Sequence, residues 1–550
     1  MNFISSRNDS ETISFREAFW RGRAEDGGAY LPADFGRLSA SGLSSVQGLS
    51  FREGFAFLLS HLLPEIELSR STQIVQAAFP EELFGEDPLK AAPLNPYNEK
   101  ELLWLAEGGP SGHALDFSLA LGRELRREFA GAGREDKLVL CGDGTMATAL
   151  AMLASQRCLP EGGENSEQQA KLLICLDQRA TEEEREMISA LLDEEDCGLF
   201  LDEGAADAEF CLLKLFSNPE KRRKWAEKGF LLQEAAGHSP LSLVTDLILL
   251  ILAFARLEEK CPLSAEDPVD LYLPLYSFGP LLAAFYGKEL GLPIRKIIVV
   301  SGRNKIFPDF LRSGRYSLER RFFKTCTPSL DRLLPAGLEA VLFELCGRKR
   351  ELLEDLRKSL AEKRLFEVPR SLQRSWELHL ASLYCEDRLI LRECRSLYDS
   401  SDYLLDAGAC AAFASIHQRG KKASEQARVL VYSAENPLWN TEFSAKAIFN
   451  RQRTDEAARE ELIEECGLYR PALVDVMKTY RKAQPELLLP VSAEELEEKL
   501  ADLLSANRGK GRVKDAALPL KEAEEKLSEP ELEEKPNSAE TGAVAELEED

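Results

Sequence analysis

Four short segments of this 550-residue chain combine glycine, hydroxyl and charged side chains in a way that suits anion binding: 142–145, 277–280, 301–305 and 433–437. Backbone N–H groups of a glycine loop that opens a helix can hold a phosphate group. Arg303 and Lys305 would favour a phosphorylated or carboxylate ligand. A structural alternative stays open, in which Asp143 caps a helix and Arg303 and Lys305 form a solvated loop edge.

Each of these segments follows a short apolar run and leads into a helical pattern. The runs are 137–141, 271–276, 296–300 and 428–432, and another at 171–176 leads to Thr181, an N-cap with Glu184 three residues on. Strands that alternate with helices predict an α/β fold with a mostly parallel sheet. Because ligands bind beyond the carboxyl ends of such strands, the four segments are predicted to share one site.

The pattern divides the chain into four predicted regions. Residues 1–97 form an N-terminal domain with few strand patterns and a helix at 51–63, and residues 98–485 form the α/β region. A C-terminal helix is expected within 486–506, opened by the capping box Ser492-x-x-Glu495. Residues 507–550 are rich in Glu, Lys, Pro and Ala, and we expect a disordered acidic tail there.

Composition excludes several classes of function. The net charge of −25 argues against binding to nucleic acid or to an anionic membrane. The 12 cysteines show no C-x-x-C spacing and the five histidines no ligand spacing, so neither a disulfide framework nor a metal site is expected. The apolar run 247–255 is shorter than the roughly 20 residues that span a bilayer. A cytoplasmic, soluble protein is expected.

The N-terminus carries the first resemblance to a known family. Phe3-Ile-Ser-Ser-Arg7, Ser14-Phe-Arg-Glu-Ala18 and Ala24-Glu-Asp26-Gly27-Gly28-Ala-Tyr30-Leu-Pro32 resemble, in order, the opening segments of threonine synthases. On physical grounds alone, the last string is a glycine turn that feeds a short extended segment.

Further segments resemble this family in the same order along about residues 1–450. Gly109-Pro110-Ser111-Gly-His113-Ala-Leu115-Asp116-Phe117 is similar to G-P-T-x-A-F-K-D-F, and Leu140-Cys-Gly142-Asp143-Gly-Thr145 to T-S-G-D-T-G. Pro274-Leu-Tyr276-Ser277-Phe278-Gly279-Pro280 is similar to P-T-G-N-F-G-D, and Val300-Ser-Gly-Arg303-Asn304-Lys305 to A-T-N-E-N-D. Thr325-Cys-Thr-Pro328-Ser329-Leu-Asp331 resembles the segment that follows, and Ser433-Ala434-Glu435 stands where the family has T-A-H.

The resemblance implies a pyridoxal-phosphate (PLP) lyase of fold type II, with two parallel-sheet lobes and an N-terminal domain. Such enzymes convert O-phospho-L-homoserine and water to L-threonine and phosphate in threonine biosynthesis. By resemblance, the cofactor-binding residues are Ser277, Phe278, Gly279 and Ser433. By the same resemblance, the substrate cleft comprises Ser111, Gly142, Asp143, Thr145, Arg303 and Asn304.

One departure bears directly on catalysis. The family's cofactor is held as a Schiff base by the lysine of A-F-K-D-F, and Leu115 stands at that position. No shift of the alignment supplies an amine, because the chain has no lysine between Lys100 and Lys137. Tyr276 also replaces a glycine of the phosphate loop and could pack in the cofactor's space. We therefore predict an impaired or inactive enzyme to which covalent attachment of PLP is unlikely.

Two alternatives remain open at this stage. The chain could be an active lyase with a noncovalently held cofactor and a substitute base such as His113. It could instead bind a different small anion or an amino acid in a reworked cleft. Association with itself or with a related chain is a further expectation, with no nucleic acid, membrane or metal as partner.

Overall fold

The computed structural model divides into two units, residues 1–508 and residues 509–550. The structure describes residues 1–505 except 35–44, 96–97, 130–136, 143, 160–169, 178, 194–195, 202–206, 236–238, 264–266, 419–426, 480–482 and 493. The predicted acidic tail therefore lies outside the described residues.

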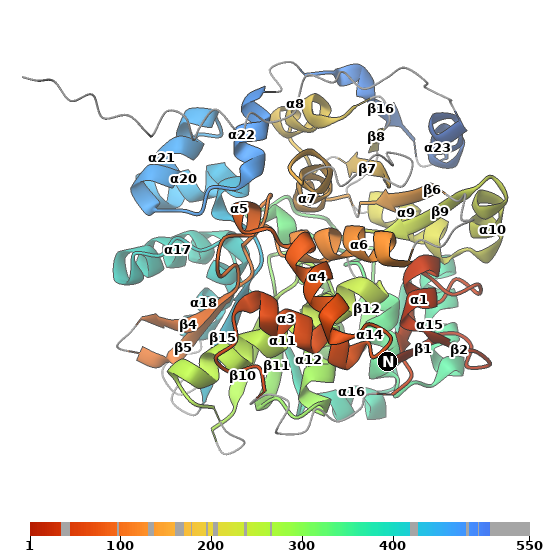
Figure 1. Cartoon of the computed structure of the whole chain (residues 1–550), viewed down its shortest axis with the longest axis horizontal. Coiled ribbons are helices and arrows are strands. Elements are labelled where there is room, and N and C mark those ends of the chain that lie inside the picture. Colours follow the sequence, from red (N-terminus) through yellow and green to blue (C-terminus); the bar gives the residue numbers. More distant parts are fainter. Residues whose placement is uncertain are drawn as a thin grey trace, which may run out of the picture. The chain divides into compact units, whose positions relative to one another are not determined.

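A six-stranded sheet forms the core of the larger lobe (Figure 1). Its order is β14 (Leu380–Tyr384), β11 (Ile294–Ser301), β10 (Val269–Pro274), β15 (Arg428–Ser433), β5 (Asn98–Leu105) and β4 (Lys90–Asn95). All neighbouring pairs are parallel except β4 with β5. The apolar runs at 271–276, 296–300 and 428–432 are thus confirmed as parallel strands, except that β10 ends at Pro274.

A second, wholly parallel sheet forms the other lobe. Its order is β16 (Leu488–Val491), β8 (Cys197–Leu201), β7 (Lys171–Asp177), β6 (Lys137–Cys141) and β9 (Phe230–Glu234). The runs at 137–141 and 171–176 are confirmed as strands. The α/β class with parallel-sheet lobes is therefore confirmed.

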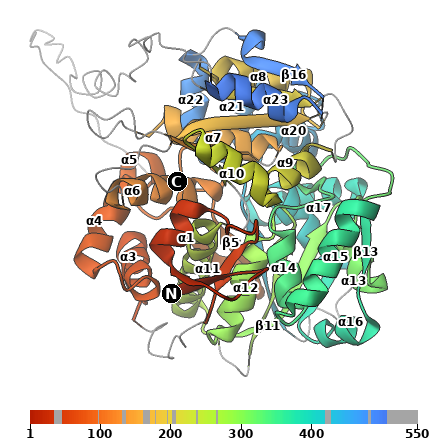
Figure 2. The same ribbon diagram turned by 90° about the vertical axis from the view of Figure 1, so that its right-hand side faces the viewer.

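One long apolar helix fills the space beside the larger sheet. This helix, α11 (Pro240–Lys260), packs against α12 (Gly279–Glu289) and α3 (Phe51–Leu62) (Figure 2). The contact with α3 is close, since a Cβ on Gly54 would lie 2.8 Å from a methyl carbon of Leu252. Among the described residues, α11 alone is long and apolar enough to cross a membrane, but 83% of its most apolar window is buried in the fold.

Hydrogen bonds of the capping-box type lie at the start of three helices, α3, α8 and α23. Ser50 and Glu53 open α3, which confirms the helix predicted at 51–63. Thr181 and Glu184 open α8 (Glu182–Leu191) as predicted. Ser492 and Glu495 exchange the predicted hydrogen bonds at 3.1 and 3.3 Å before α23 (Leu496–Ser505). The helix predicted within 486–506 is nevertheless shorter than expected, because Leu488–Val491 pairs with β8 as strand β16.

The N-terminal residues form a small antiparallel sheet of β1 (Asn2–Ser5), β2 (Thr12–Ser14) and β3 (Tyr30–Pro32), with α1 (Phe15–Arg21) between β2 and β3. The remaining helices and strands are α4 (Leu68–Ala78), α5 (Glu81–Phe84), α6 (Leu115–Phe129), α7 (Met146–Arg157), α9 (Asp207–Ser217), α10 (Pro219–Glu227), α13 (Ile306–Ser313), β12 (Arg315–Ser317), α14 (Leu338–Leu345), α15 (Arg350–Lys363), β13 (Leu365–Glu367), α16 (Arg370–Trp376), α17 (Asp387–Ser401), α18 (Ala407–Gln418), α20 (Thr441–Phe449), α21 (Glu456–Cys466) and α22 (Ala472–Thr479).

The Asp-Gly-Gly turn of the N-terminal string joins distant parts of the chain. Asp26 accepts hydrogen bonds from the Ser5 hydroxyl at 2.9 Å and from the Gly28 N–H at 2.8 Å. Gly27 has φ +79°, and a Cβ there would lie 2.2 Å from the Ser217 carbonyl oxygen. Glycine is therefore required for both backbone conformation and space.

Arg7 connects this turn to both lobes. Its guanidinium donates to the carbonyl oxygens of Asp26 and Ser217 and to both carboxylate oxygens of Glu339 on α14, the latter at 2.9 and 2.7 Å. Burial alone would raise the pKa of Glu339, but Arg7 and Arg23 lower it to about 2. The N-terminal string thus closes a buried ion-pair network.

Candidate functional site

Loops at the carboxyl ends of β5 and β15 are joined by backbone hydrogen bonds. The Ala106 N–H donates to Ser433 O at 3.0 Å, and the Ala114 N–H donates to Ala434 O at 2.8 Å. His113 and Glu435 form an isolated antiparallel bridge. Because both strands end at the same edge of the larger sheet, the predicted residues Ser111 and Ser433 belong to adjoining loops.

Ser111 is part of a closed turn before α6. Its N–H and hydroxyl donate to the two carboxylate oxygens of Asp116 at 2.7 and 2.8 Å. The indole N–H of Trp439 donates to the Ser111 carbonyl oxygen. Burial raises the pKa of Asp116 to about 6, against the effect of the Ser111 hydrogen bonds. This turn holds the start of α6 in place, and Ser111 is committed to that role.

Leu115 is the first residue of α6 and is buried in an apolar cluster. Its side chain is 8% exposed and belongs to a cluster with Leu119, Leu138 and Leu140. The Leu115 N–H donates to Nδ1 of His113 at 2.9 Å, while Nε2 of His113 lies 3.7 Å from Glu435. The His113 ring is therefore held between a backbone donor and a carboxylate.

A buried polar cluster occupies the edge of the sheet between β10 and β15. The Tyr276 hydroxyl donates to Asp406, and the Ser433 Oγ contacts both Asp406 and Glu107, the latter at 2.9 Å. Asp406 also accepts from the N–H groups of Gly408 and Ala409 at the start of α18. We call Tyr276, Asp406, Ser433 and Glu107 the tyrosine–carboxyl cluster.

Proton counting within the tyrosine–carboxyl cluster requires a neutral carboxyl. The single Ser433 O–H can donate to one carboxylate only, so another group must donate to Ser433 Oγ. Burial, followed by the charge of Asp406, raises the pKa of Glu107 to about 8. Protonated Glu107 is thus the donor near neutral pH. Burial and then the charge of Glu435 raise the pKa of Asp406 to about 6.

The loop that opens α12 carries three of the predicted cofactor-binding residues. The Phe278 N–H donates to Ala336 O at 2.9 Å, and its fully buried ring lies 5.1 Å from that of Phe307. The N–H groups of Leu275 and Tyr276 donate to Val300 O and Pro274 O, each at 2.9 Å. Ser277 is half-buried, and Gly279 begins the helix. Three N–H groups of residues 275–278 are therefore already bonded to carbonyl oxygens.

The predicted cleft residues after β6 are only partly described. Asp143 lies outside the described residues. The Thr145 hydroxyl accepts from Thr148 N–H and caps α7. Arg332 Nη2 donates to Thr145 Oγ1 at 3.4 Å, and Arg179 Nη2 donates to Gly144 O at 3.2 Å. These two buried arginines were missed by the sequence analysis.

Arg303 and Asn304 are adjacent in the loop that follows β11, but one side chain is exposed and the other is buried. Asn304 is buried and donates to Asp331 at 2.6 Å and to Phe323 O at 2.7 Å. Arg303 is exposed, with its guanidinium 4.2 Å from the Phe323 ring centroid. Lys305 similarly lies over the Tyr384 ring at 4.5 Å. The geometry favours the loop-edge interpretation of Arg303 and Lys305 over the predicted cleft role.

A hollow of about 730 Å³ lies beside these loops. Its lining includes Arg179, Thr325, Trp439 and Asn440, together with charged residues of both signs. Across the described ranges, no group of three or more His, Cys, Asp or Glu side chains could hold a metal ion.

Comparisons with known proteins agree with this architecture. Residues 2–79 match the family model described as the threonine synthase N terminus. The human protein "Threonine synthase-like 1" is 25% identical over 418 residues, covering 72% of this chain and 53% of that protein. A threonine synthase from Pseudomonas aeruginosa is 24% identical over 362 residues, covering 65% of this chain and 71% of that protein. The chain spans about half the length of the threonine synthase-like 1 proteins that it matches.

Solved structures extend the likeness to most of the fold. The PLP-bound threonine synthase from Brucella melitensis has a TM-score of 0.70 at 17% identity, covering 92% of this chain and all of that chain (100%). The yeast threonine synthase also has a TM-score of 0.70, at 18% identity, covering 91% of this chain and 99% of its own. The N-terminal family model, the sequence relatives and the shared fold together show that this chain is similar to threonine synthases over most of its described length.

Proposed function

We propose that this protein is a threonine synthase-like pseudoenzyme, which keeps the family fold but does not convert O-phospho-L-homoserine to L-threonine. The observation that carries the proposal is Leu115, which stands where the family has its cofactor lysine. Leucine has no amine to attach PLP or to move a proton. General acid–base catalysis alone contributes roughly 10²–10⁴-fold to such rates, and the same lysine also holds the cofactor.

The packing around Leu115 supports the pseudoenzyme proposal. The side chain packs with Leu119, Leu138 and Leu140 in the core cluster of the smaller lobe. A lysine would have to place its amine beside these apolar groups, where desolvation disfavours the charged form. Leucine at this position instead contributes to packing, so the cluster is consistent with selection for stability rather than for imine chemistry.

The remaining cofactor residues also fit PLP poorly. When bound, PLP supplies an electron sink for reactions at amino-acid carbons. A phosphate group would need free N–H donors, and among the predicted cofactor residues that of Phe278 already bonds to the Ala336 carbonyl oxygen at 2.9 Å. The Ser433 hydroxyl, predicted to contact the cofactor, is engaged by Glu107 and Asp406. We therefore derive no catalytic step through this cofactor.

Tyr276 fills space that a smaller residue would leave open. Its ring crosses from the end of β10 to the start of α18, where the phenol oxygen would lie 2.3 Å from a Cβ on Gly408. The ring also packs edge-on against Tyr432 at 6.3 Å. This supports the prediction that Tyr276 packs within the cleft.

Phosphate release from O-phospho-L-homoserine with added PLP tests the proposal. We expect no enzymatic turnover from the wild-type chain or from Leu115→Met, a control of similar volume that also lacks an amine. The Pseudomonas aeruginosa threonine synthase serves as the positive control. Turnover by the wild type at more than 1% of that control's rate would overturn the pseudoenzyme proposal.

A second candidate function is the binding of a small anionic amino acid in the hollow of about 730 Å³, because its lining carries acidic side chains as well as basic ones. Arg179, Lys324 and Lys446 line it, whereas Arg303 does not. Equilibrium dialysis with O-phospho-L-homoserine in the absence of PLP tests this candidate. Lys324→Gln should weaken binding and Arg303→Gln should not, while equal effects of the two variants would reject the hollow as the site.

A further inference from the structure

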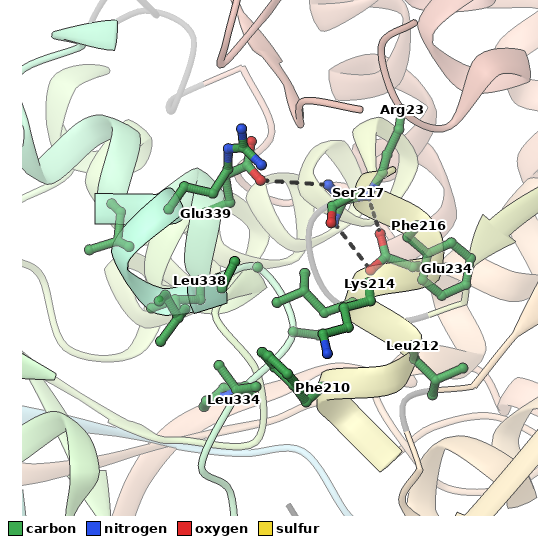
Figure 3. Close-up of a pocket in the computed structure, with 18 of the residues that line it drawn as sticks. Arg23, Phe210, Leu212, Lys214, Phe216, Ser217, Glu234, Leu334, Leu338 and Glu339 are labelled. Atoms are coloured by element: carbon green, nitrogen blue, oxygen red, sulfur yellow. Dashed lines mark hydrogen bonds and ion pairs between the residues drawn. The ribbon is translucent and has the colours of Figure 1, made fainter. Parts of the chain in front are cut away.

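A separate apolar cavity of about 110 Å³ lies between α9, α14 and α15 (Figure 3). Figure 3 shows Phe210 and Phe216 of α9 on one side, and Leu334 and Leu338 on the other. Leu342, Leu353, Leu356 and Leu360 extend the apolar lining. Of the predicted cleft residues that the structure describes, only Gly142 lines this cavity, and none of the predicted cofactor-binding residues does.

The size of the cavity limits what it can hold. An engineered apolar cavity of about 150 Å³ in another protein stays dry and binds benzene. A space of about 110 Å³ therefore suits one small ring or a short branched chain rather than a long acyl chain. Its lining of leucine and phenylalanine side chains favours an apolar group over a hydrated one.

Most charged groups at the cavity are paired with one another. Arg23 Nε lies 2.9 Å from Glu234 and its Nη1 lies 4.0 Å from Glu339. Glu339 is neutralised further by Arg7 at 2.7 Å. Arg357 donates to Glu354 at 2.7 Å. These pairs leave little net charge to attract or repel a ligand.

Lys214 is the exception. Its Nζ lies 4.2 Å from the centroid of the Phe210 ring, which forms part of the cavity wall. Within the described part of the chain, no carboxylate is found at ion-pair distance from this amine. Lys214, Ser217 and Arg357 also line a neighbouring hollow of about 630 Å³. The cavity thus has an apolar interior and an unneutralised cation where it meets a wider polar space.

We propose that this cavity binds a small carboxylate that carries one aromatic ring or a short branched aliphatic chain. The apolar end lies among Phe210, Leu338 and Leu342, and the carboxylate lies at the Lys214 amine. Charge-assisted hydrogen bonding to an ammonium group suits a carboxylate and disfavours an amine ligand of the same shape. The site is independent of PLP and of the pseudoenzyme proposal.

Titration calorimetry of the full chain with phenylacetate tests the proposal, with phenethylamine as the cationic counterpart. We expect phenylacetate to bind saturably at one site. Phenethylamine should bind at least tenfold more weakly, because its ammonium group would face the Lys214 ammonium, and a tenfold loss corresponds to about 1.4 kcal/mol. Equal affinity for the two compounds, or no binding of phenylacetate, would overturn the proposal.

Two variants locate the site, and a third controls for lysine removal. Lys214→Gln should weaken phenylacetate binding about fivefold, the effect of losing roughly 1 kcal/mol of a solvent-accessible charge pair. Leu338→Phe should abolish binding by filling the cavity. Lys228→Gln removes a lysine that also lies over an aromatic ring, Trp225, but does not line the cavity, so it should leave binding unchanged. Unchanged binding in Leu338→Phe, with the far-UV circular dichroism of the wild type, would place phenylacetate elsewhere and reject the assignment.

Discussion

The N-terminal turn and the predicted cofactor cleft both use buried charged groups, but they differ in what those groups face. Around the turn, Arg7 and Arg23 face Glu339, so opposite charges satisfy one another. In the tyrosine–carboxyl cluster, Glu107 and Asp406 face each other around Ser433. The first arrangement lowers the pKa of its carboxyl to about 2, and the second raises the pKa of Glu107 to about 8.

This difference distinguishes the scaffold from the cleft that we propose to be catalytically inactive. The motifs at the turn resemble the family closely because each residue has a structural partner far along the chain. At the cleft, the side chains have been exchanged, and the new ones bond to one another rather than leave donors open. Under the pseudoenzyme proposal, the chain keeps the fold without the cofactor chemistry.

The largest effect is expected from breaking the ion-pair network at the turn. Glu339→Gln leaves the buried Arg7 guanidinium without its carboxylate and leaves Arg23 with Glu234 alone. The free energy of unfolding should fall by about 3–5 kcal/mol. Asp399→Asn, in an exposed pair with Arg395, is the control and should cost about 1 kcal/mol or less. Urea denaturation measures both, and a similar loss in the two variants would show that the network is not a stabilising hub.

The next largest loss of stability is expected where the backbone of Gly27 approaches the Ser217 carbonyl group. Gly27 and Gly229 share φ +79°, but a Cβ on Gly229 meets nothing within 4 Å. Gly229→Ala should therefore cost about 1 kcal/mol for backbone conformation alone. Gly27→Ala should cost about 3 kcal/mol, because the Ser217 carbonyl must also move. Thermal unfolding of the pair measures the difference, and equal melting temperatures would contradict the close approach.

A smaller effect is expected in the cleft. Tyr276→Phe removes one of several donors to Asp406, so it should lower the free energy of unfolding by about 1–2 kcal/mol. Tyr398→Phe is a control, since its hydroxyl donates to the Glu465 carbonyl oxygen near the surface at 3.2 Å, and it should change stability by about 0.5 kcal/mol or less. A stabilised Tyr276→Phe variant would show that the phenol is not part of a satisfied cluster.

Per pH unit, the smallest effect is the pH dependence of stability. The pKa of Glu107 rises from 4.5 to about 8 on folding, so the folded chain holds this proton over that interval and the unfolded chain releases it. The stabilisation is complete below about pH 4.5 and is lost as the pH rises toward 8. Relative to Glu107→Gln, the wild type should lose about 1 kcal/mol per pH unit between pH 5 and 7. A constant difference between the two proteins across this range would contradict a protonated Glu107.

The helices and strands could be predicted from the sequence better than the tyrosine–carboxyl cluster that lies between them. Apolar β-branched runs such as 296–300 predict strands because their pattern is local, and the capping boxes at Thr181 and Ser492 depend on residues three positions apart. The pairing of Tyr276 with Asp406 spans 130 positions and has no local signature. Strand β16 was not predicted, because it has only four residues and is defined by its pairing with the distant strand β8.

The predictability of the site residues also depends on whether their position follows from local pattern or from distant contacts. The strand-end rule is topological and places Ser433 in a loop at the edge of the sheet, whereas Ser111 is assigned to the cleft by resemblance alone. Their adjoining loops are evident only in the structure. The exposure of Arg303 was not evident, because adjacent residues of a loop can face opposite directions: Asn304 is buried while Arg303 lies over Phe323. Arg179 and Arg332 were missed because nothing near them in the sequence indicates that both approach residues 144–145.

Covalent attachment of PLP shows whether the cleft holds a reactive amine. The wild-type chain and Leu115→Lys are incubated with PLP, reduced with borohydride, and mapped by peptide mass spectrometry. We expect no stoichiometric pyridoxyl adduct on the cleft side chains of the wild type. An adduct at position 115 in the variant alone would show that Leu115 by itself prevents attachment. A single stoichiometric adduct on any cleft side chain of the wild type would contradict the pseudoenzyme proposal.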